Sequence, residues 1–494
     1  MNMYSSCNDK IDHNKISQLV EKLGYFIQKY NIEIDSRKAD SLSIFCAYPG
    51  NKCDGRKFVP DVIRNGVKCL IQEGPFCLKL DNNYSIENLR EYIGLLASYK
   101  YSNPSKHIKT IGVTGTNGKT SITQWLAQIY NSMNQKAAVI GTLGSGIYPL
   151  MADHASTTPD PVTIQKLFYD FVKENVYLAA MEVSSHGLDQ GRLNGIQFET
   201  AIFTNLTQDH LDYHKTLENY YNAKRSLFYW HEIKRLIINT DDQYGRRLYN
   251  ELKLSNSSAK IITYGINSGD VIAKDISISL NGTKFILEYN LELIEIKASV
   301  IGRFNVYNLL AVAAYLILDG FPLTDIAKYI NIIKPISGRM DTIFKKGQPL
   351  VIVDFAHTPD ALYNVLQSLR QIENRGKIIC VFGCGGDRDR SKRPIMGEIV
   401  VKNSDYAIIT SDNPRTEDPS SIIDEILRGV PMDASGFRVI VDRKKAIKYA
   451  ISMAQENDII LIAGKGHEQY QEINGVRHYF SDFGEAKLAL DNDF

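Results

Sequence analysis

The sequence predicts an α/β protein of three domains, and two observations lead to this fold class. At 494 residues the chain is too long for a single hydrophobic core. From about residue 107 onward, short apolar runs alternate with helical patterns, which is typical of parallel sheets covered by helices. We therefore expect a small leading domain at 1–105, a central domain at 106–335 and a last domain at 336–494.

The composition excludes several classes of partner. Lys and Arg number 57 against 56 Asp and Glu, so no field of one sign would attract nucleic acid or anionic lipid. The start of the chain lacks the apolar core of a secretion signal, and the apolar run at 309–318 is too short to cross a bilayer. The seven cysteines contain no C-x-x-C pair, which favours reduced thiols. We expect a cytoplasmic monomer without nucleic-acid binding or membrane insertion.

Each domain shows its own run of elements. In the leading domain, 43–47 and 67–72 read as strands, and "KYSNPSKHIK" reads as a linker. In the central domain the strands are "TIGVTG", "AAVIG" and "VYLAAMEVS", with a helix at "SITQWLAQIYNSM". In the last domain the strands are "LVIVDFA", "KIICVFGC", "YAIITS" and "DIILIAGKG". The strands end in Gly- or Asp-bearing loops, where open α/β sheets place their ligands.

A glycine loop stands between the first central strand and its helix, in "TIGVTGTNGKTSIT". Backbone N–H groups at a helix start suit a polyphosphate, Lys119 would reach its outer phosphates, and Thr120 would ligate Mg²⁺. Only two residues separate Gly115 from Gly118, so the general phosphate-loop pattern fits imperfectly. The alternative is a glycine turn that happens to precede Lys-Thr. The loop residues are Gly115, Thr116, Asn117, Gly118, Lys119, Thr120 and Ser121.

Two later segments offer further ligands for a metal ion. Glu182 ends an apolar strand, and His210 follows the apolar start of "FTNLTQDHLDYH". Carboxylate oxygen suits Mg²⁺, and imidazole is a less usual partner. A lone histidine after a strand is more often a structural hydrogen bonder, so both readings of His210 stay open.

The segment "SDNPR" carries an arginine on a stiffened loop. Pro414 fixes one backbone dihedral and restricts the residue before it. A rigid, planar donor fork at Arg415 suits a carboxylate or a phosphate. The alternative is a surface ion pair of Arg415 with Glu417 or Asp418.

Taken in order, these motifs resemble the Mur ligase family, the ATP-dependent amide-forming enzymes that build the peptide of bacterial cell-wall precursors. The resemblance covers nearly the whole chain and rests on "GVTGTNGKTS", "STTPDP", "EVSSHGLDQGR", "TNLTQDHLDYH", "AKRSLF", "GRFNVYN", "SGRMD", "DFAHTPDAL", "GCGGDRDRSKRP", "SDNPR" and "AGKGHE". The shortened phosphate loop is this family's own form. The resemblance implies a leading UDP-binding domain, a central P-loop ATPase-like domain with a parallel sheet, and a Rossmann-like last domain.

Within the family, the motifs are most similar to those of members that add the third amino acid. This implies a carbon–nitrogen ligase for peptidoglycan biosynthesis that uses ATP and Mg²⁺. It would add meso-2,6-diaminopimelate to the D-Glu side-chain carboxylate of UDP-MurNAc-L-Ala-D-Glu through an acyl phosphate. Domain closure would assemble the site, because ATP would lie on the central domain and the amino acid on the last.

The resemblance also assigns roles to single residues. The implied catalytic residues are Lys119, Lys224 and His210, and the implied metal ligands are Thr120, Glu182, His210 and Lys224 as a carbamate formed from CO₂. Without the resemblance, Lys224 would read as a solvated helix residue. Besides the glycine loop, the implied ATP-binding residues are Asn305, Arg339 and His357.

The two remaining substrates have their own implied residues. Those for the UDP-muramoyl dipeptide are Ser36, Thr157, Thr158, Ser184, Gln190 and Arg192, and the segment 51–53 aligns with a uridine-contacting loop. Those for diaminopimelate are Arg388, Asp412, Asn413, Pro414, Arg415, Gly464 and Glu468. Arg415 would select diaminopimelate over lysine, because lysine lacks the distal carboxylate and would leave the guanidinium unpaired.

Three alternative functions stay open on the sequence alone. The chain could be a lysine-adding ligase of the same kind, or a ligase like folylpolyglutamate synthetase, which should lack the leading domain and "DNPR". From another class, it could be a non-catalytic scaffold that binds ATP. Against a scaffold, every charged position that the transfer step needs is occupied.

Overall fold

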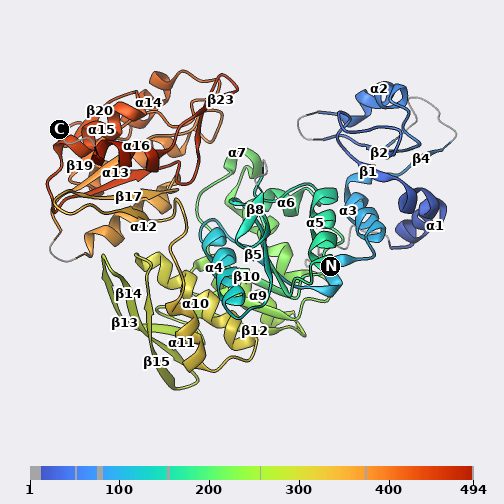
Figure 1. The fold of residues 1–494 in the computed structure, drawn as a ribbon, viewed down its shortest axis with the longest axis horizontal. Helices are drawn as coiled ribbons and strands as arrows, with labels where there is room; N and C mark the ends of the chain where they lie inside the picture. Colours follow the sequence, from blue (N-terminus) through green and yellow to red (C-terminus); the bar gives the residue numbers. More distant parts are fainter. Residues whose placement is uncertain are drawn as a thin grey trace.

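The computed structural model describes residues 13–50, 53–74, 82–152, 156–255, 257–372 and 375–491. Its three parts follow one another along the chain, with the middle part between the other two (Figure 1). Asn51 and Lys52 of the expected uridine loop lie outside the described residues. Within the described ranges, no helix has the length and apolar character needed to cross a membrane.

The N-terminal domain is a small parallel sheet with helices packed against it. Its strands run in the order β1 (Asn31–Glu33), β2 (Ser43–Ala47), β3 (Cys69–Gln72) and β4 (Asn83–Ser85). The helices are α1 (His13–Lys29), α2 (Val59–Arg64) and α3 (Leu89–Lys100). Leu23 and Ile93 from the helices meet Ile44 of the sheet in a buried core. The strands predicted at 43–47 and 67–72 are both present.

The middle domain is built on a mixed sheet whose centre is parallel. The parallel strands lie side by side in the order β12 (Lys260–Gly265), β11 (Arg235–Asn239), β10 (Thr200–Phe203), β5 (Lys109–Thr114), β9 (Leu178–Glu182) and β6 (Ala137–Gly141). Along β6, Val139 faces one buried cluster and Ile140 faces the other, because successive side chains point to opposite faces. This double burial explains the continuous apolar runs in the sequence.

Five further strands extend this sheet beyond its parallel centre, with antiparallel pairs at both ends, so the sheet as a whole is mixed. They are β7 (Gly144–Ile147) and β8 (Leu150–Ala152) at one end, and β13 (Val271–Ser279), β14 (Gly282–Tyr289) and β15 (Glu292–Ala298) at the other. The pairs β6–β7, β7–β8, β13–β14 and β14–β15 are antiparallel, as their short hairpin connections favour, whereas β13 pairs in parallel with β12.

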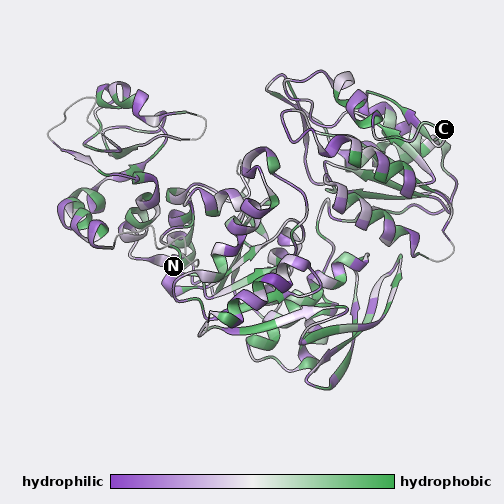
Figure 2. Cartoon of the chain, turned by 180° about the vertical axis from the view of Figure 1, so that it is seen from behind, coloured by the Kyte–Doolittle hydropathy of each residue, from purple (hydrophilic) through white to green (hydrophobic). Residues whose placement is uncertain are grey.

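Helices cover both faces of the middle sheet. One face carries α4 (Lys119–Ser132), α10 (Arg303–Leu318) and α11 (Leu323–Asn331), and the other carries α5 (Pro161–Lys173), α8 (Leu217–Arg225) and α9 (Gln243–Leu254). The apolar run at 309–318 lies in α10 and is almost entirely buried, as the sequence predicts. In Figure 2 the hydrophobic residues concentrate on the inner strands and helices of the middle and C-terminal domains.

The C-terminal domain is a second α/β unit. Its sheet has the order β16 (Asp341–Ile343), β17 (Leu350–Asp354), β21 (Ile459–Ala463), β18 (Ile378–Phe382), β19 (Tyr406–Ile409) and β20 (Phe437–Val439), with β16 antiparallel to the rest. The helices are α12 (Pro359–Arg370), α13 (Lys392–Asn403), α14 (Pro419–Leu427), α15 (Arg443–Met453) and α16 (Asp482–Asp491). The carboxyl ends of β18, β19 and β21 carry the loops that the sequence singles out.

Side-chain contacts join the middle and C-terminal domains. Ile278 and Phe304 pack against the buried cluster of the C-terminal domain. The Asn117 amide donates a hydrogen bond to Asp360 over 3.1 Å. Loops of both domains therefore face a common space.

Candidate active site

The glycine loop connects β5 to α4. Hydrogen bonds with the residues that follow the neighbouring strand β10 fix its backbone. Thr116 N donates to Asn205 O over 2.9 Å, and Asn117 N donates to Asn205 Oδ1 over 2.9 Å. Thr204 Oγ1 donates to Asn117 O over 2.6 Å. These contacts hold the loop open at the start of α4, where free N–H groups and the helix dipole favour a phosphate.

Gly115 cannot be replaced without moving this support. Its φ is +149°, and a Cβ there would lie 1.8 Å from Thr204 Oγ1 and 3.0 Å from Asn205 O. We expect Gly115→Ala to lower kcat/KM for ATP at least about tenfold, since strained backbone of this kind costs about 1–3 kcal/mol. Phosphate release at varied ATP concentration measures this. Gly320→Ala is the control, because Gly320 also has positive φ (+93°) but open space around it; equal effects of the two changes would contradict the prediction.

Two lysines meet at the carbonyl oxygen of Gly115. Lys119 Nζ donates to it over 2.8 Å and Lys224 Nζ over 2.7 Å. Burial lowers the pKa of Lys224 well below its usual range, and the charge of Lys119 lowers it further. Lys224, from α8, is thus a buried amine that favours its neutral form and not a solvated helix residue.

Glu182 and Thr120 are in direct contact. Thr120 Oγ1 donates to Glu182 Oε2 over 3.0 Å, and Thr142 N donates to Glu182 Oε1 over 2.8 Å. Arg339 donates from its NH2 group to Thr120 Oγ1 over 3.3 Å, while its buried Nε has no hydrogen-bond partner among the described residues. Hydroxyl and carboxylate oxygens suit Mg²⁺, and the unpaired Nε leaves a donor for a nucleotide oxygen.

His210 lies at the start of α7 (Leu211–His214), with its Nε2 3.4 Å from Asp209 Oδ2. Burial lowers the pKa of His210, and His186 and Lys224 lower it further, so the ring is neutral and able to bind a metal. Among the described residues no group of three or more His, Cys, Asp and Glu side chains gathers as a metal cage. Mg²⁺ needs none, because it is usually bound through one or two carboxylates plus substrate phosphates.

His357 and Lys392 approach the same space from the C-terminal domain. Lys392 Nζ donates to His357 O over 3.0 Å and lies 3.9 Å from Asp209 Oδ1. The sequence reading did not single out Lys392, although it stands in "GGDRDRSKRP". Its position could have indicated a role in the site, because a lysine at the start of a helix that follows a strand-end loop is well placed to reach a ligand.

A second cavity, of about 370 Å³, extends from the glycine loop between the two domains. Asn308, Asp360 and Arg339 line it. Asn305 does not: its amide donates to Ile301 O over 2.9 Å and its oxygen accepts from Asn308 Nδ2 over 3.1 Å. Asn305 therefore positions Asn308 through this hydrogen bond. Asn308, one helical turn further on, is the residue that faces the cavity. The sequence did not single it out.

The main cavity, of about 460 Å³, is shared by the middle and C-terminal domains. The expected site residues that line it are Thr116, Asn117, Gly118, Lys119, Thr120, Thr157, Thr158, Glu182, Ser184, Arg192, His210, Arg339, His357, Arg388, Asp412, Asn413, Arg415, Gly464 and Glu468. Gln190 supports this lining, since it accepts hydrogen bonds from Arg192 over 3.0 Å and 2.6 Å. The structure thus brings together most of the residues that the motifs predict.

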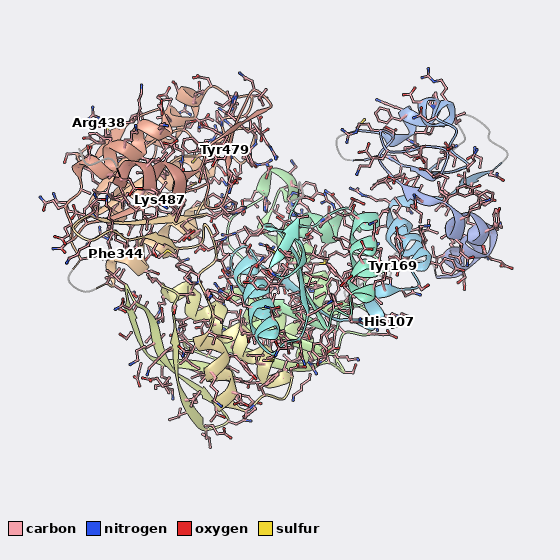
Figure 3. All side chains as sticks on the ribbon, viewed as in Figure 1. His107, Tyr169, Phe344, Arg438, Tyr479 and Lys487 are labelled. Atoms are coloured by element: carbon pink, nitrogen blue, oxygen red, sulfur yellow. The ribbon has the colours of Figure 1, made fainter. Side chains whose placement is uncertain are left out.

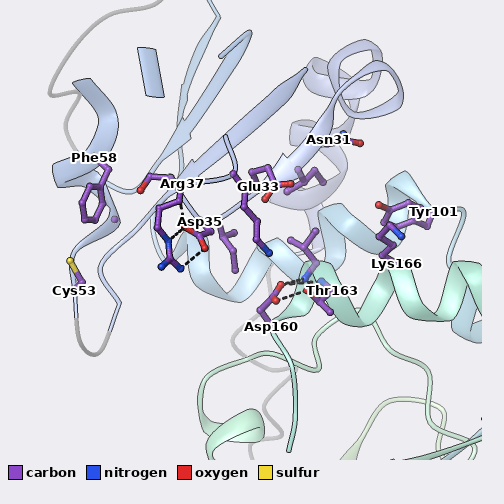
Figure 4. Close-up of a pocket in the computed structure, with 16 residues that line it drawn as sticks. Asn31, Glu33, Asp35, Arg37, Cys53, Phe58, Tyr101, Asp160, Thr163 and Lys166 are labelled. Atoms are coloured by element: carbon purple, nitrogen blue, oxygen red, sulfur yellow. Dashed lines mark hydrogen bonds and ion pairs between the residues drawn. The ribbon is translucent and has the colours of Figure 1, made fainter. Parts of the chain in front are cut away.

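Ser36, another residue expected to bind the UDP-muramoyl dipeptide, does not line the main cavity. It lines a separate cavity of about 790 Å³ between the N-terminal and middle domains. Figure 4 shows this cavity, with Arg37 bonded to Asp35 on one side and Thr163 bonded to Asp160 on the other. The expected residues for the UDP-muramoyl dipeptide are therefore divided between two places, as a long ligand would require.

The loop after β19 presents Arg415 to the main cavity. Asn413 Nδ2 donates to Glu468 Oε2 over 2.8 Å, and Asn413 Oδ1 accepts from Lys465 Nζ over 3.0 Å. Gly464 has φ +119°, and a Cβ there would lie 2.5 Å from Asp412 Oδ2. The two loops are thus packed directly on each other.

The expected alternative for Arg415, an ion pair with Glu417 or Asp418, is wrong. Glu417 pairs with Arg393 over 2.8 Å, and Asp418 caps α14. The guanidinium of Arg415 instead donates to Gly386 O over 2.7 Å, and its Nε lies 3.6 Å from Glu472 Oε2. Arg388 lines the same cavity and has no ion pair with any residue in the described ranges.

Comparison with known proteins agrees with this arrangement. Three family models match in order: "Mur ligase family, catalytic domain" at 29–101, "Mur ligase middle domain" at 113–316 and "Mur ligase, glutamate ligase domain" at 338–466. The chain is 43% identical to the UDP-N-acetylmuramoyl-L-alanyl-D-glutamate–2,6-diaminopimelate ligase of Chromobacterium violaceum, over 96% of each chain. It is 46% identical to the ligase of the same name from Neisseria meningitidis serogroup A, over 92% of this chain and 94% of that one.

A solved structure shows the same fold. It is a UDP-N-acetylmuramoyl-L-alanyl-D-glutamate–2,6-diaminopimelate ligase with a TM-score of 0.68 and 38% identity, over 94% of each chain. The three-domain α/β architecture, the order of the motifs and these relatives agree over nearly the whole length of the chain. The protein belongs to the Mur ligase family.

Proposed function

We infer that this chain is the ATP-dependent ligase that adds meso-2,6-diaminopimelate to the D-Glu side-chain carboxylate of UDP-MurNAc-L-Ala-D-Glu, in peptidoglycan biosynthesis. The observation that carries this function is a single cavity. It is lined by Lys119 of the phosphate loop and by Arg415, which belongs to another domain. Relatives that cover more than nine-tenths of the chain bear the name of the same reaction.

The chemistry needs cations more than it needs a protein nucleophile. A carboxylate is a poor electrophile, so ATP first phosphorylates it, and the amine then attacks the acyl phosphate and releases phosphate. Negative charge gathers on phosphoryl oxygens during both steps. We assign Lys119 to these oxygens: its ammonium would exchange the carbonyls of Gly115 and Thr116 for phosphate. Arg339 would contribute its Nε, for which the described part of the chain supplies no hydrogen-bond partner.

Thr120, Glu182 and neutral His210 fit Mg²⁺, which when bound neutralises polyphosphate charge. We propose in addition that Lys224 carries a carbamate. Its neutral amine would attack CO₂, form an N–C bond and release a proton. The product is an anionic oxygen ligand in place of a cation, which suits a site that holds divalent metal. The lowered pKa of Lys224 supports this step, because only the free amine reacts.

For the amino acid, we assign Arg415 to the distal carboxylate and Arg388, Asn413 and Glu468 to its remaining polar groups. Asp412, Pro414 and Gly464 would shape the pocket. For the nucleotide dipeptide, Ser36 would lie near the UDP end, while Thr157, Thr158, Ser184, Gln190 and Arg192 would lie near the acceptor carboxylate. We place the enzyme in the cytoplasm, where ATP is available, and expect a monomer, because one chain lines the whole main cavity.

The decisive experiment compares the two diamines. Purified protein is mixed with ATP, Mg²⁺, the nucleotide dipeptide and either diaminopimelate or lysine, and released phosphate is counted. We expect turnover with diaminopimelate and at least about a hundredfold less with lysine, since a missing hydrogen-bonding group is strongly rejected by a site built for it. Comparable turnover would indicate the lysine-adding ligase, and no turnover with either would favour the scaffold.

A further inference from the structure

The hairpin of β22 (Tyr470–Ile473) and β23 (Val476–Tyr479) stands apart from the sheet of the C-terminal domain. Its inner strand lies against the loop that holds Arg415. Gln471 Nε2 donates to Asp412 O over 2.6 Å, and Glu472 N donates to Asn413 Oδ1 over 2.9 Å. On the outer strand, Tyr479 lies at the margin of the domain and is 83% exposed (Figure 3). Strand β22 therefore packs against this loop, while strand β23 faces solvent.

The hairpin also holds the backbone of Arg415 itself. Arg415 N donates to Glu472 O over 3.0 Å, and Asn474 N donates to Arg415 O over 2.7 Å. Arg415 has φ +51°, a left-handed conformation that is uncommon for residues other than glycine. Pro414 alone does not specify this conformation, since it fixes its own φ and restricts only the residue before it. The two backbone bonds to the hairpin stabilise it.

The side chain of Arg415 is fixed in the same way. Its Nε lies 3.6 Å from Glu472 Oε2, and its NH1 group donates to Gly386 O over 2.7 Å. Its NH2 group makes no hydrogen bond within the part of the chain that the structure describes, and Arg415 lines the main cavity. Protein groups therefore lie at the Nε and NH1 positions of the guanidinium, and NH2 is the nitrogen left to donate to a ligand carboxylate.

We propose that the β22–β23 hairpin, through Gln471 and Glu472, is the positioning element that sets Arg415 for the second carboxylate of the amino-acid substrate. Neither residue lines the cavity, so both act through the loop and through Arg415. This role rests on the proposed function, because it requires a substrate with a distal carboxylate. Without the hairpin contacts, Arg415 would have to be ordered when the substrate binds, which weakens binding.

Kinetics of three variants test this role: Gln471→Ala, Glu472→Ala and the double variant. We expect the double variant to raise KM for diaminopimelate about tenfold, equivalent to about 1.4 kcal/mol, with KM for ATP changed less than twofold. The turnover ratio of diaminopimelate to lysine should fall in parallel. Arg477→Ala is the matched control: Arg477 pairs with Glu472 in the hairpin register, but its guanidinium lies 4.2 Å from the centre of the Tyr470 ring. It should behave as wild type.

Hydrogen exchange supplies a readout that needs no substrate. In the double variant the backbone amides of Asn413, Arg415 and Thr416 should exchange several-fold faster than in wild type, while those of β18 should not change. An unchanged or lowered KM for diaminopimelate in the double variant overturns the proposal, whatever the exchange rates. Wild type without diaminopimelate turnover rejects the proposed function and this role together, whereas active wild type with an unaffected double variant rejects only the hairpin's role.

Discussion

Replacing Lys224 by alanine should leave the enzyme nearly inactive, with kcat lowered at least about a hundredfold. The proposed carbamate would help to hold metal, and metal stabilisation of transferring phosphoryl groups is worth several kcal/mol. The fold should survive, because Lys119 also donates to Gly115 O. Phosphate release measures activity, and an added small carboxylate such as formate should restore part of it.

Lys253→Ala is the control for this substitution, since Lys253 is an exposed lysine on α9. Carbon-13 NMR in labelled bicarbonate should show a carbamate signal in wild type that disappears in Lys224→Ala. Full activity of Lys224→Ala without added carboxylate would exclude a catalytic carbamate. Loss of activity with no carbamate signal in wild type would point to the amine itself.

Arg415→Lys should lose most diaminopimelate turnover, with kcat/KM lowered about ten- to a hundredfold. A lysine keeps the charge but offers a point donor in place of a planar fork, so the two-bond grip on a carboxylate is lost. An unpaired buried polar group costs about 1–3 kcal/mol, and a charged group costs more. Initial rates with each diamine, at saturating ATP, measure the change.

Arg428→Lys is a suitable control, because Arg428 is an exposed arginine that follows α14 in the same domain. Both variants keep the net charge, so a general electrostatic effect would appear in both. If the ratio of diaminopimelate to lysine turnover stays the same in Arg415→Lys, the guanidinium does not select the substrate.

The architecture could be predicted from the sequence because buried strands and amphipathic helices leave regular patterns. The strand predicted at "AAVIG" is β6, and the helix predicted around 309–318 is α10. The antiparallel ends of the middle sheet were missed. Their strands, β13 to β15, are partly exposed and alternate in burial, so they lack the continuous apolar runs of the parallel centre.

The site could be predicted only as far as motifs fix side-chain direction. Asn305 and Asn308 are one turn apart in α10, and the sequence does not say which of them faces the cavity. Glu472 is 57 positions away from Arg415, so nothing local indicated that it, and not Glu417, would be the ion-pair partner. Such pairings depend on how the hairpin folds back over the loop.

The link between Arg339 and Thr120 has a consequence for ligand affinity. Arg339 lies just after the segment that joins the middle and C-terminal domains, and Thr120 opens the helix at the phosphate loop. With ATP at the proposed site, nucleotide binding and the relative orientation of the two domains would share this contact, and each would bias the other to the same extent. A ligand that fixes the two domains in one orientation should change ATP affinity without touching the nucleotide, which makes this connection a target for inhibitors that compete with none of the three substrates.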